Sequence, residues 1–237
     1  MKKILFLIIL LNSFLMASQE QSVIDVLAKA QEELLNQDTL SCNLNYSYYP
    51  TYITVIALES YDGRLVKKLN NFYIKIKSTI FLNDVIKKKS LKLNEDQKAI
   101  LVSDVTSNLN QQNVIDNQQL LKQFKSYKLI DKNDYWICQF VAPLISQLPY
   151  SKVEVLIRKR DYKTVKQILY FSAKVPYLNK ENKEVFDNPR LEVTISNYSN
   201  NLTKEEISLT TIDSYITTTK TKIVAKKLYK DYSIIEN

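Results

Sequence analysis

Two cysteines, Cys42 and Cys138, carry the most reactive side chains in this sequence. In an oxidising compartment they could form one disulfide, whereas apart they would behave as small buried hydrophobic residues. Both lie in strand-like stretches with large apolar neighbours, Leu40 and Leu44 around the first and Trp136 and Phe140 around the second. The sequence leaves both interpretations open.

Other catalytic chemistry is restricted by composition. The sequence contains no histidine, which excludes serine–histidine and cysteine–histidine catalysis and removes the commonest metal ligand. It has one glycine, Gly63, whereas phosphate-binding and dinucleotide-binding loops need several. Aspartate and glutamate are plentiful, but no spacing singles out a catalytic pair. We therefore expect a non-enzymatic protein with no catalytic residues, no cofactor and no metal site.

The net charge of the chain is +8, and the positive residues are clustered. Such clusters attract anionic lipid headgroups or an acidic partner, but lysine is also common on solvated turns and strand edges. We favour the second interpretation, and without a basic–aromatic module we expect no nucleic-acid binding. The clusters are residues 87–89, residues 158–160 and Lys220, Lys222, Lys226, Lys227 and Lys230.

The N-terminus has the pattern of a secretory signal peptide. Lys2 and Lys3 precede an apolar run over residues 4–11, and Ala17 and Ser18 are small enough for cleavage. The apolar run is shorter than the roughly 20 apolar residues of a spanning helix, and no cysteine follows it to accept a lipid. We predict a signal peptide over residues 1–18, export to the periplasm of a Gram-negative bacterium, and no stable membrane anchor after cleavage.

The first element of the mature chain should be an amphipathic helix. Ser22 is a good N-cap, and Asp25 stands three residues later, as in a capping box. Apolar side chains then recur every three or four residues, at Val23, Val26, Leu27, Ala30 and Leu34. The helix should end near residues 36–38.

Strands dominate the rest of the chain. Residues 40–48 alternate between apolar and polar, which predicts a half-buried strand. A second strand is expected over residues 53–60, followed by a turn centred on Asp62-Gly63. Further short strands are expected between residues 65 and 104, with a polar tip at 94–97, and again at 128–131, 135–141, 153–159, 164–173 and 191–195.

Three other segments break this pattern. Residues 107–119 are rich in Asn and Gln and predict a loop, after which Asn117 could cap a second helix ending near Lys125. Residues 176–189 predict a long hairpin loop. The tail over residues 207–235 predicts one or two edge strands and an extended wrap. We therefore predict an α+β fold, a curved antiparallel sheet or incomplete β-barrel covered by the N-terminal and the mid-chain helix, as a single domain over residues 19–237.

This order of elements resembles the outer-membrane lipoprotein carriers (LolA-like and LolB-like proteins). The local stretches that carry the resemblance are residues 71–76, 81–84 and 91–103, the last ending in Ile-Leu-Val-Ser, and the pair 153–158 and 165–171 followed by residues 189–193. The resemblance implies a half-barrel with an apolar cavity that binds a lipid or the acyl chain of a lipoprotein. It assigns no ligand-binding residue to this chain.

Two functions follow from this sequence. In the first, six apolar residues of alternating strands line a cavity for a hydrophobic ligand, although such residues more often fill a core; they are Phe72, Ile74, Ile76, Val153, Val155 and Ile157. In the second, the core is filled and the protein is an interaction subunit of a cell-envelope complex. A tyrosine-rich stretch suits a half-wet contact surface of that kind, at Tyr46, Tyr48, Tyr49 and Tyr52.

Overall fold

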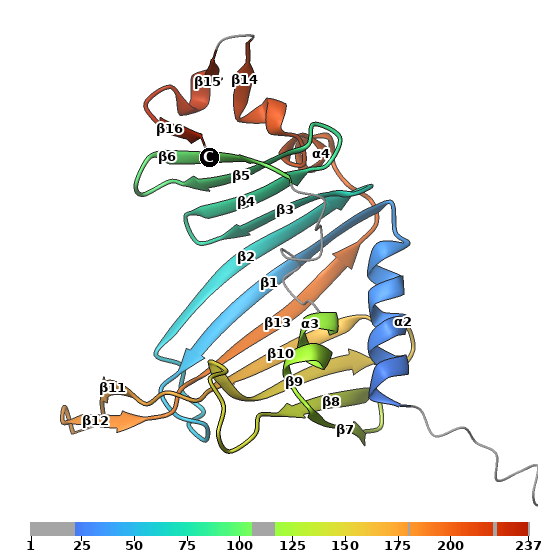
Figure 1. Ribbon diagram of the computed structural model, residues 1–237, viewed down its shortest axis with the longest axis vertical. Coiled ribbons are helices and arrows are strands. Elements are labelled where there is room, and N and C mark those ends of the chain that lie inside the picture. The colour runs from blue at the N-terminus through green and yellow to red at the C-terminus, as the bar shows by residue number, and fades with distance from the viewer. Residues whose placement is uncertain (1–21, 106–116, 180, 220–221, 237) are drawn as a thin grey trace, which may run out of the picture.

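The computed structural model describes residues 22–105, 117–179, 181–219 and 222–236 (Figure 1). The predicted signal peptide, most of the Asn- and Gln-rich loop and one of the tail lysines, Lys220, lie outside these residues. The described helical segments are α2 (Val23–Leu35), α3 (Asn117–Gln123), α4 (Lys204–Leu209) and the 3-10 turns η2 (Ile212–Ser214) and η3 (Lys227–Tyr229).

The helix α2 begins as its sequence predicts. The Asp25 backbone N–H donates to Ser22 Oγ at 3.1 Å, and the Ser22 backbone N–H donates to the Asp25 carboxylate at 3.3 Å. This reciprocal pair is a capping box, which satisfies amide groups that have no partner within the helix. The predicted helix is therefore confirmed, including its start.

A single large sheet forms the body of the molecule. Its order, from one edge to the other, is β16-β6-β5-β4-β3-β2-β1-β13-β10-β9-β8-β7 within the described residues. Its strands are β1 (Thr39–Tyr49), β2 (Glu59–Lys68), β3 (Asn71–Ile76), β4 (Thr79–Asp84), β5 (Lys89–Asn94), β6 (Ala99–Asp104), β7 (Ser126–Asp131), β8 (Tyr135–Val141), β9 (Tyr150–Arg158), β10 (Thr164–Phe171), β13 (Arg190–Ser199) and β16 (Ser233–Glu236).

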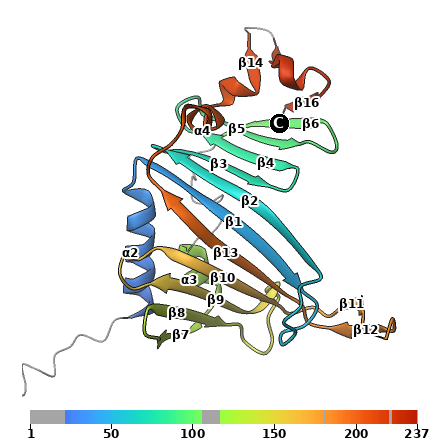
Figure 2. The same cartoon turned by 180° about the vertical axis from the view of Figure 1, so that it is seen from behind.

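The sheet is curved and open. Neighbouring strands pair antiparallel, as predicted, except that β16 joins β6 in parallel at one edge. The two edge strands, β7 and β16, do not meet, so the sheet is not closed into a barrel (Figures 1 and 2). Two small hairpins stand outside it: β11 (Val175–Leu178) with β12 (Glu184–Asp187), and β14 (Ile216–Thr218) with β15 (Ile223–Ala225).

Strand β1 defines the two faces of the sheet. Leu40, Cys42 and Leu44 point to the face that carries α2, here the α2 face, while Ser41 and Asn43 point to the opposite face. The two halves of the sheet bury apolar residues on different faces. Each half therefore needs its own cover.

The helices cover the half that runs from β10 to β7. On the α2 face, Val26 and Leu27 of α2 and Phe124 after α3 pack with Trp136, Cys138 and Phe140 of β8 and with Val153, Val155 and Ile157 of β9. All these side chains are at most 9% exposed. The two predicted covering helices therefore close this half of the sheet.

The C-terminal segment covers the other half, on the opposite face. Ile212, Tyr215 and Ile216 pack against β2–β6 in a second core with Val66, Tyr73, Ile80, Leu82, Leu91, Leu93, Ile100 and Val102. The tail, expected to be edge strands and a wrap, therefore adds a helical cover and contributes the edge strand β16 (Figure 1).

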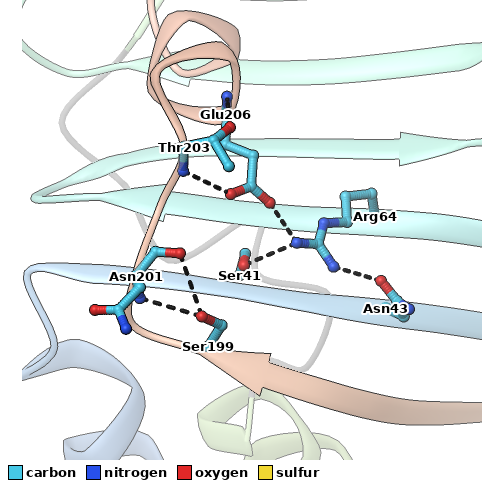
Figure 3. A network of polar contacts seen from close by, with 7 residues as sticks. All are labelled: Ser41, Asn43, Arg64, Ser199, Asn201, Thr203 and Glu206. Atoms are coloured by element: carbon cyan, nitrogen blue, oxygen red, sulfur yellow. Dashed lines mark hydrogen bonds and ion pairs between the residues drawn. The ribbon is translucent and has the colours of Figure 1, made fainter.

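Arg64 on β2 joins the sheet to this C-terminal cover (Figure 3). Its guanidinium forms an ion pair with Glu206 of α4 and donates to Asn43 Oδ1 and to Ser41 Oγ, the last at 2.9 Å. Glu206 also accepts from the Thr203 backbone N–H at 3.0 Å, so that the same carboxylate completes the capping box of α4. Ser41 and Asn43, which alternate with the apolar residues of β1, thus help Arg64 to hold α4, the first helix of the C-terminal cover, on the sheet.

Two local predictions were wrong. Asp62-Gly63 lies inside β2 rather than in a turn, since Gly63 pairs with Leu44 and Ile76 on both sides. Glycine is needed there because a Cβ would lie 2.7 Å from the Lys75 carbonyl oxygen. The predicted strand over residues 53–60 is a loop until Glu59, although its apolar residues alternate.

Candidate ligand groove

An apolar groove lies between α2 and the centre of the sheet. We call it the α2 groove. Its floor is formed on the α2 face by Leu40, Cys42, Leu44, Leu65, Phe72, Ile74, Ile195 and Tyr198, and its other walls are formed by Ala30, Gln31, Glu33, Leu34, Leu35 and Gln37 from α2 and the following turn, with Lys163 and Thr164. The groove therefore exists because the α2 helix and four strands of the curved sheet leave an apolar space between them.

The enclosed part of the groove is small. It has a volume of about 60 Å³. One water molecule needs roughly 10–15 Å³ on this measure, so the space suits a few water-sized groups and not an entire lipid. A long ligand would have to lie along the groove and leave its remainder outside.

The floor continues as apolar surface beyond this enclosed part. Ile74 pairs with Phe81 across β3 and β4, and Ile76 is the next residue of β3 on the same face. The Ile76 and Phe81 side chains are half-buried and pack against the cluster that forms the floor. Apolar contact is therefore available along β3 and β4 outside the groove.

Lys67 holds the end of α2 above the groove. Its ammonium donates to the Leu35 carbonyl oxygen at 3.0 Å and to the Gln37 carbonyl oxygen. These bonds satisfy carbonyl groups that lack partners at a helix C-terminus, where a positive charge is also favoured by the helix dipole. Burial lowers the pKa of Lys67 below its ordinary value because desolvation disfavours the charged ammonium.

One polar atom of the groove wall is buried without a partner. Gln37 Nε2 donates to Glu33 Oε1 at 2.5 Å, whereas Gln37 Oε1 has no hydrogen-bond partner among the described residues. The opposite amide orientation would face two oxygens toward each other, so this assignment is the favourable one. A buried unsatisfied acceptor of this kind is costly to the fold.

The six predicted cavity residues lie in two places. Phe72 and Ile74 line the α2 groove, and Ile76 packs beside its floor. Val153, Val155 and Ile157 lie instead in the core beneath α2 and α3, each 0% exposed. The sequence could not separate the two groups, since both alternate in the same way along their strands.

Several groove residues were not among the predicted ones. Leu40, Cys42 and Leu44 belong to a strand whose alternation is plain in the sequence, and Leu34 belongs to the predicted apolar stripe of α2. That pattern identifies them as inward-facing. Their position around a space depends on where α2 crosses the sheet, which local sequence does not determine.

The possible disulfide between Cys42 and Cys138 is not formed. Both cysteines are free and buried. They lie on β1 and β8, which are four positions apart in the sheet. Strands are spaced by about 4.8 Å, whereas disulfide-bonded Cα atoms lie within about 7 Å. The alternative of two separate buried thiols is the correct one.

These thiols are poor nucleophiles. Burial raises the pKa of Cys42 to about 12 and that of Cys138 to about 12, because the thiolate is disfavoured in apolar surroundings. Within the described part of the chain, no three or more Cys, Asp or Glu side chains gather where they could hold a metal ion. What the α2 groove offers is therefore mainly apolar contact, with polar side chains such as Glu33, Lys163 and Thr164 in its walls.

No helix of the described residues is both long and apolar enough to cross a membrane. No protein-family model matches the chain, and no curated protein matches its sequence.

Among solved structures, the chain is similar to a LolA superfamily protein from Nitrosomonas europaea, with 15% identity, a TM-score of 0.36, and coverage of 81% of this chain and 99% of that one. It is also similar to a putative outer membrane lipoprotein-sorting protein domain from Vibrio parahaemolyticus, with 10% identity, a TM-score of 0.31, and coverage of 79% and 96%. A third match is to the Pseudomonas aeruginosa MucA/MucB complex, with 11% identity, a TM-score of 0.35, and coverage of 75% and 56%. Solved structures thus confirm the predicted resemblance to LolA-like proteins as a distant similarity in fold. No residue role is carried over from them.

Proposed function

We propose that this protein is a non-enzymatic binding protein that holds the apolar chain of a lipid or of a lipoprotein in the α2 groove. The observation that carries the proposal is the composition of the groove floor, where apolar side chains from β1, β2, β3 and β13 converge beneath α2. Burial of each CH₂ group of a ligand contributes about 0.8 kcal/mol, so a short stretch of chain gives useful affinity.

The geometry favours a ligand bound at one end. The enclosed space of about 60 Å³ holds only part of a chain. Ile76 and Phe81 extend the apolar surface along β3 and β4, and the remainder of the chain would lie over them. This arrangement favours a single linear chain over a bulky ring system.

The proposed site of action is the periplasm. This part of the proposal rests on the basic, apolar and small-residue pattern of residues 1–18, which is typical of an exported protein. Immunoblotting of cell fractions for the full-length protein tests it. Protein of the cleaved size in the periplasmic fraction supports the proposal, and uncleaved protein in the cytoplasm contradicts it.

A titration with cis-parinaric acid, a fatty acid whose fluorescence rises in apolar surroundings, tests ligand binding. We expect saturable binding of about one probe per protein chain. Leu34→Trp, which fills the groove from α2, should weaken binding at least about tenfold. Ile24→Trp is the matched control, because Ile24 lies on the same helix, is 48% exposed and does not line the groove.

Two outcomes would contradict this proposal. One is the absence of saturable probe binding by the wild-type protein. The other is equal binding by Leu34→Trp when circular dichroism shows that the variant is folded. Either outcome would favour the alternative function, an interaction subunit with a filled core. The fully buried Val153, Val155 and Ile157 already belong to such a filled core.

A further inference from the structure

Three connections leave the same end of the sheet. Across neighbouring strands, Tyr49 of β1 pairs with Arg190 of β13, which pairs with Tyr170 of β10. Tyr170 pairs with Lys152 of β9, which pairs with Val141 of β8. The loop over residues 50–58, the loop over residues 142–149 and the β11–β12 hairpin all begin or end at this row, and they lie at the same end of the molecule (Figures 1 and 2).

The tips of these connections are apolar and unusually exposed. Ile53 is 90% exposed and Val55 86%, while Leu144 and Ile145 are fully exposed. Leu178 and Phe186 of the hairpin are each more than 60% exposed. Folding alone does not explain this group of exposed apolar residues, because each keeps apolar surface in water at a cost in free energy. We call these six residues the apolar tips.

The bases of the connections are bonded to one another. The Tyr52 hydroxyl lies 2.6 Å from Ser151 Oγ and donates to the Phe171 carbonyl oxygen. Arg190 Nη1 donates to the Thr51 carbonyl oxygen at 2.9 Å, and Ser172 Oγ donates to the Leu148 carbonyl oxygen at 2.8 Å. The apolar tips are therefore presented by one hydrogen-bonded platform and not by three independent loops.

The chemistry of the tips favours a lipid bilayer over a protein partner. Residues 50–58 and 142–149 contain no charged side chain, so they can enter an apolar phase without burying a charge. The β11–β12 hairpin exposes Glu181, Lys183 and Glu184, so it would stay among the polar headgroups. The tips are separate projections and are not part of the α2 groove, which lies elsewhere on the sheet. Separate projections suit insertion between lipids, whereas a folded protein partner would need a continuous complementary surface.

The residues behind the tips suit the polar boundary of a bilayer. Tyr52, Tyr150 and Tyr177 are half-buried close to the row of strand ends, and tyrosine is enriched at membrane–water interfaces. Lys174 is exposed at the base of the hairpin, and the net charge of +8 falls only to +6 when Lys2 and Lys3 leave with the predicted signal peptide, which still attracts anionic headgroups. We propose that the apolar tips insert into the interface of an anionic phospholipid bilayer and dock the protein on it reversibly.

Flotation with vesicles tests this docking surface. The vesicles are phosphatidylethanolamine and phosphatidylglycerol at about 3:1, compared with phosphatidylcholine alone. We expect the wild-type protein to float with the anionic vesicles. The double variant Leu144→Asp and Ile145→Asp should lower the fraction bound at least about tenfold, because two carboxylates would have to leave water. Both positions are fully exposed, so the fold should be unaffected.

A matched control places the same change elsewhere. Leu228 is 80% exposed and Ile86 is 71% exposed, and both lie in the half of the molecule with the C-terminal cover. The double variant Leu228→Asp and Ile86→Asp adds the same charge, so it should bind within about twofold of the wild-type protein if the apolar tips are the docking surface.

Three results would overturn the proposal. The first is a wild-type protein that floats with neither vesicle, and the second is a Leu144 and Ile145 double variant that floats as the wild type does. In the third, light scattering would show a wild-type oligomer that this variant dissociates, without flotation, which would identify the tips as a self-association surface. None of these results bears on probe binding in the α2 groove, so the two proposals fail separately.

Discussion

At the residue scale, Cys42 and Cys138 should be free and unreactive in the folded protein. Both are buried, and both have a pKa of about 12, so almost no thiolate forms at neutral pH. A thiol reagent should label neither residue in the native state and both after unfolding without reductant. A rapid native reaction, or fewer than two thiols after unfolding, would contradict this account.

Gly63 should tolerate no side chain. A Cβ there would lie 2.7 Å from the Lys75 carbonyl oxygen and 3.2 Å from the Tyr46 ring. The first neighbour is backbone and cannot rotate away, so Gly63→Ala should lower the free energy of unfolding by about 1–3 kcal/mol in urea denaturation. Ser60→Ala, three residues earlier in β2, is the control and should change it by less than about 0.5 kcal/mol. Equal stability of Gly63→Ala and the wild type would show that β2 and β3 are farther apart here.

At the element scale, the attachment of α4 should depend on pH. The bonds from Arg64, and then from the Thr203 backbone, lower the pKa of Glu206. In the unfolded chain the pKa of a glutamate is about 4.3. The Glu206 carboxylate therefore stabilises the folded state above that pH. This stabilisation is lost as the pH falls through the lower pKa of Glu206 in the folded state. Glu206→Gln should cost about 1 kcal/mol at pH 7, with a difference from the wild type that shrinks below about pH 4.

The control for this prediction is the neighbouring acid. Glu205→Gln removes a carboxylate from the same turn of α4, but Glu205 is exposed and forms none of the ion pairs described. Its stability difference from the wild type should be small at pH 7. A Glu206→Gln difference that stays constant from pH 7 to pH 3 would contradict the proposed role of the Arg64–Glu206 pair.

Elements that depend on neighbours in sequence were predictable, and elements that depend on distant contacts were not. The start of α2 at Ser22 and the alternation of β1 follow from adjacent residues, and both are confirmed. The Asp62-Gly63 pair is typical of a turn, and only the close approach of β3 explains why a glycine is needed inside a strand there. Ile53 and Val55 alternate as in a strand, but no local signal shows that they project into solvent.

At the scale of the whole molecule, one sheet carries two covers on opposite faces. The helices α2 and α3 close one half and the C-terminal segment closes the other, so the apolar residues of β1–β3 on the α2 face receive only part of a cover. The sequence predicted the curved sheet and the two covering helices. It could not predict where their cover ends, and that boundary creates the α2 groove.

Photolabelling with a fatty acid that carries a diazirine at the end of its chain tests the central claim most directly. If the chain end enters the α2 groove, mass spectrometry should find saturable adducts in peptides from α2, β1 and β3, at positions around Leu34, Leu44 and Phe72. An excess of unlabelled fatty acid should compete for them. Adducts confined to residues 50–58 and 142–149, or labelling that does not saturate, would contradict ligand binding in the groove.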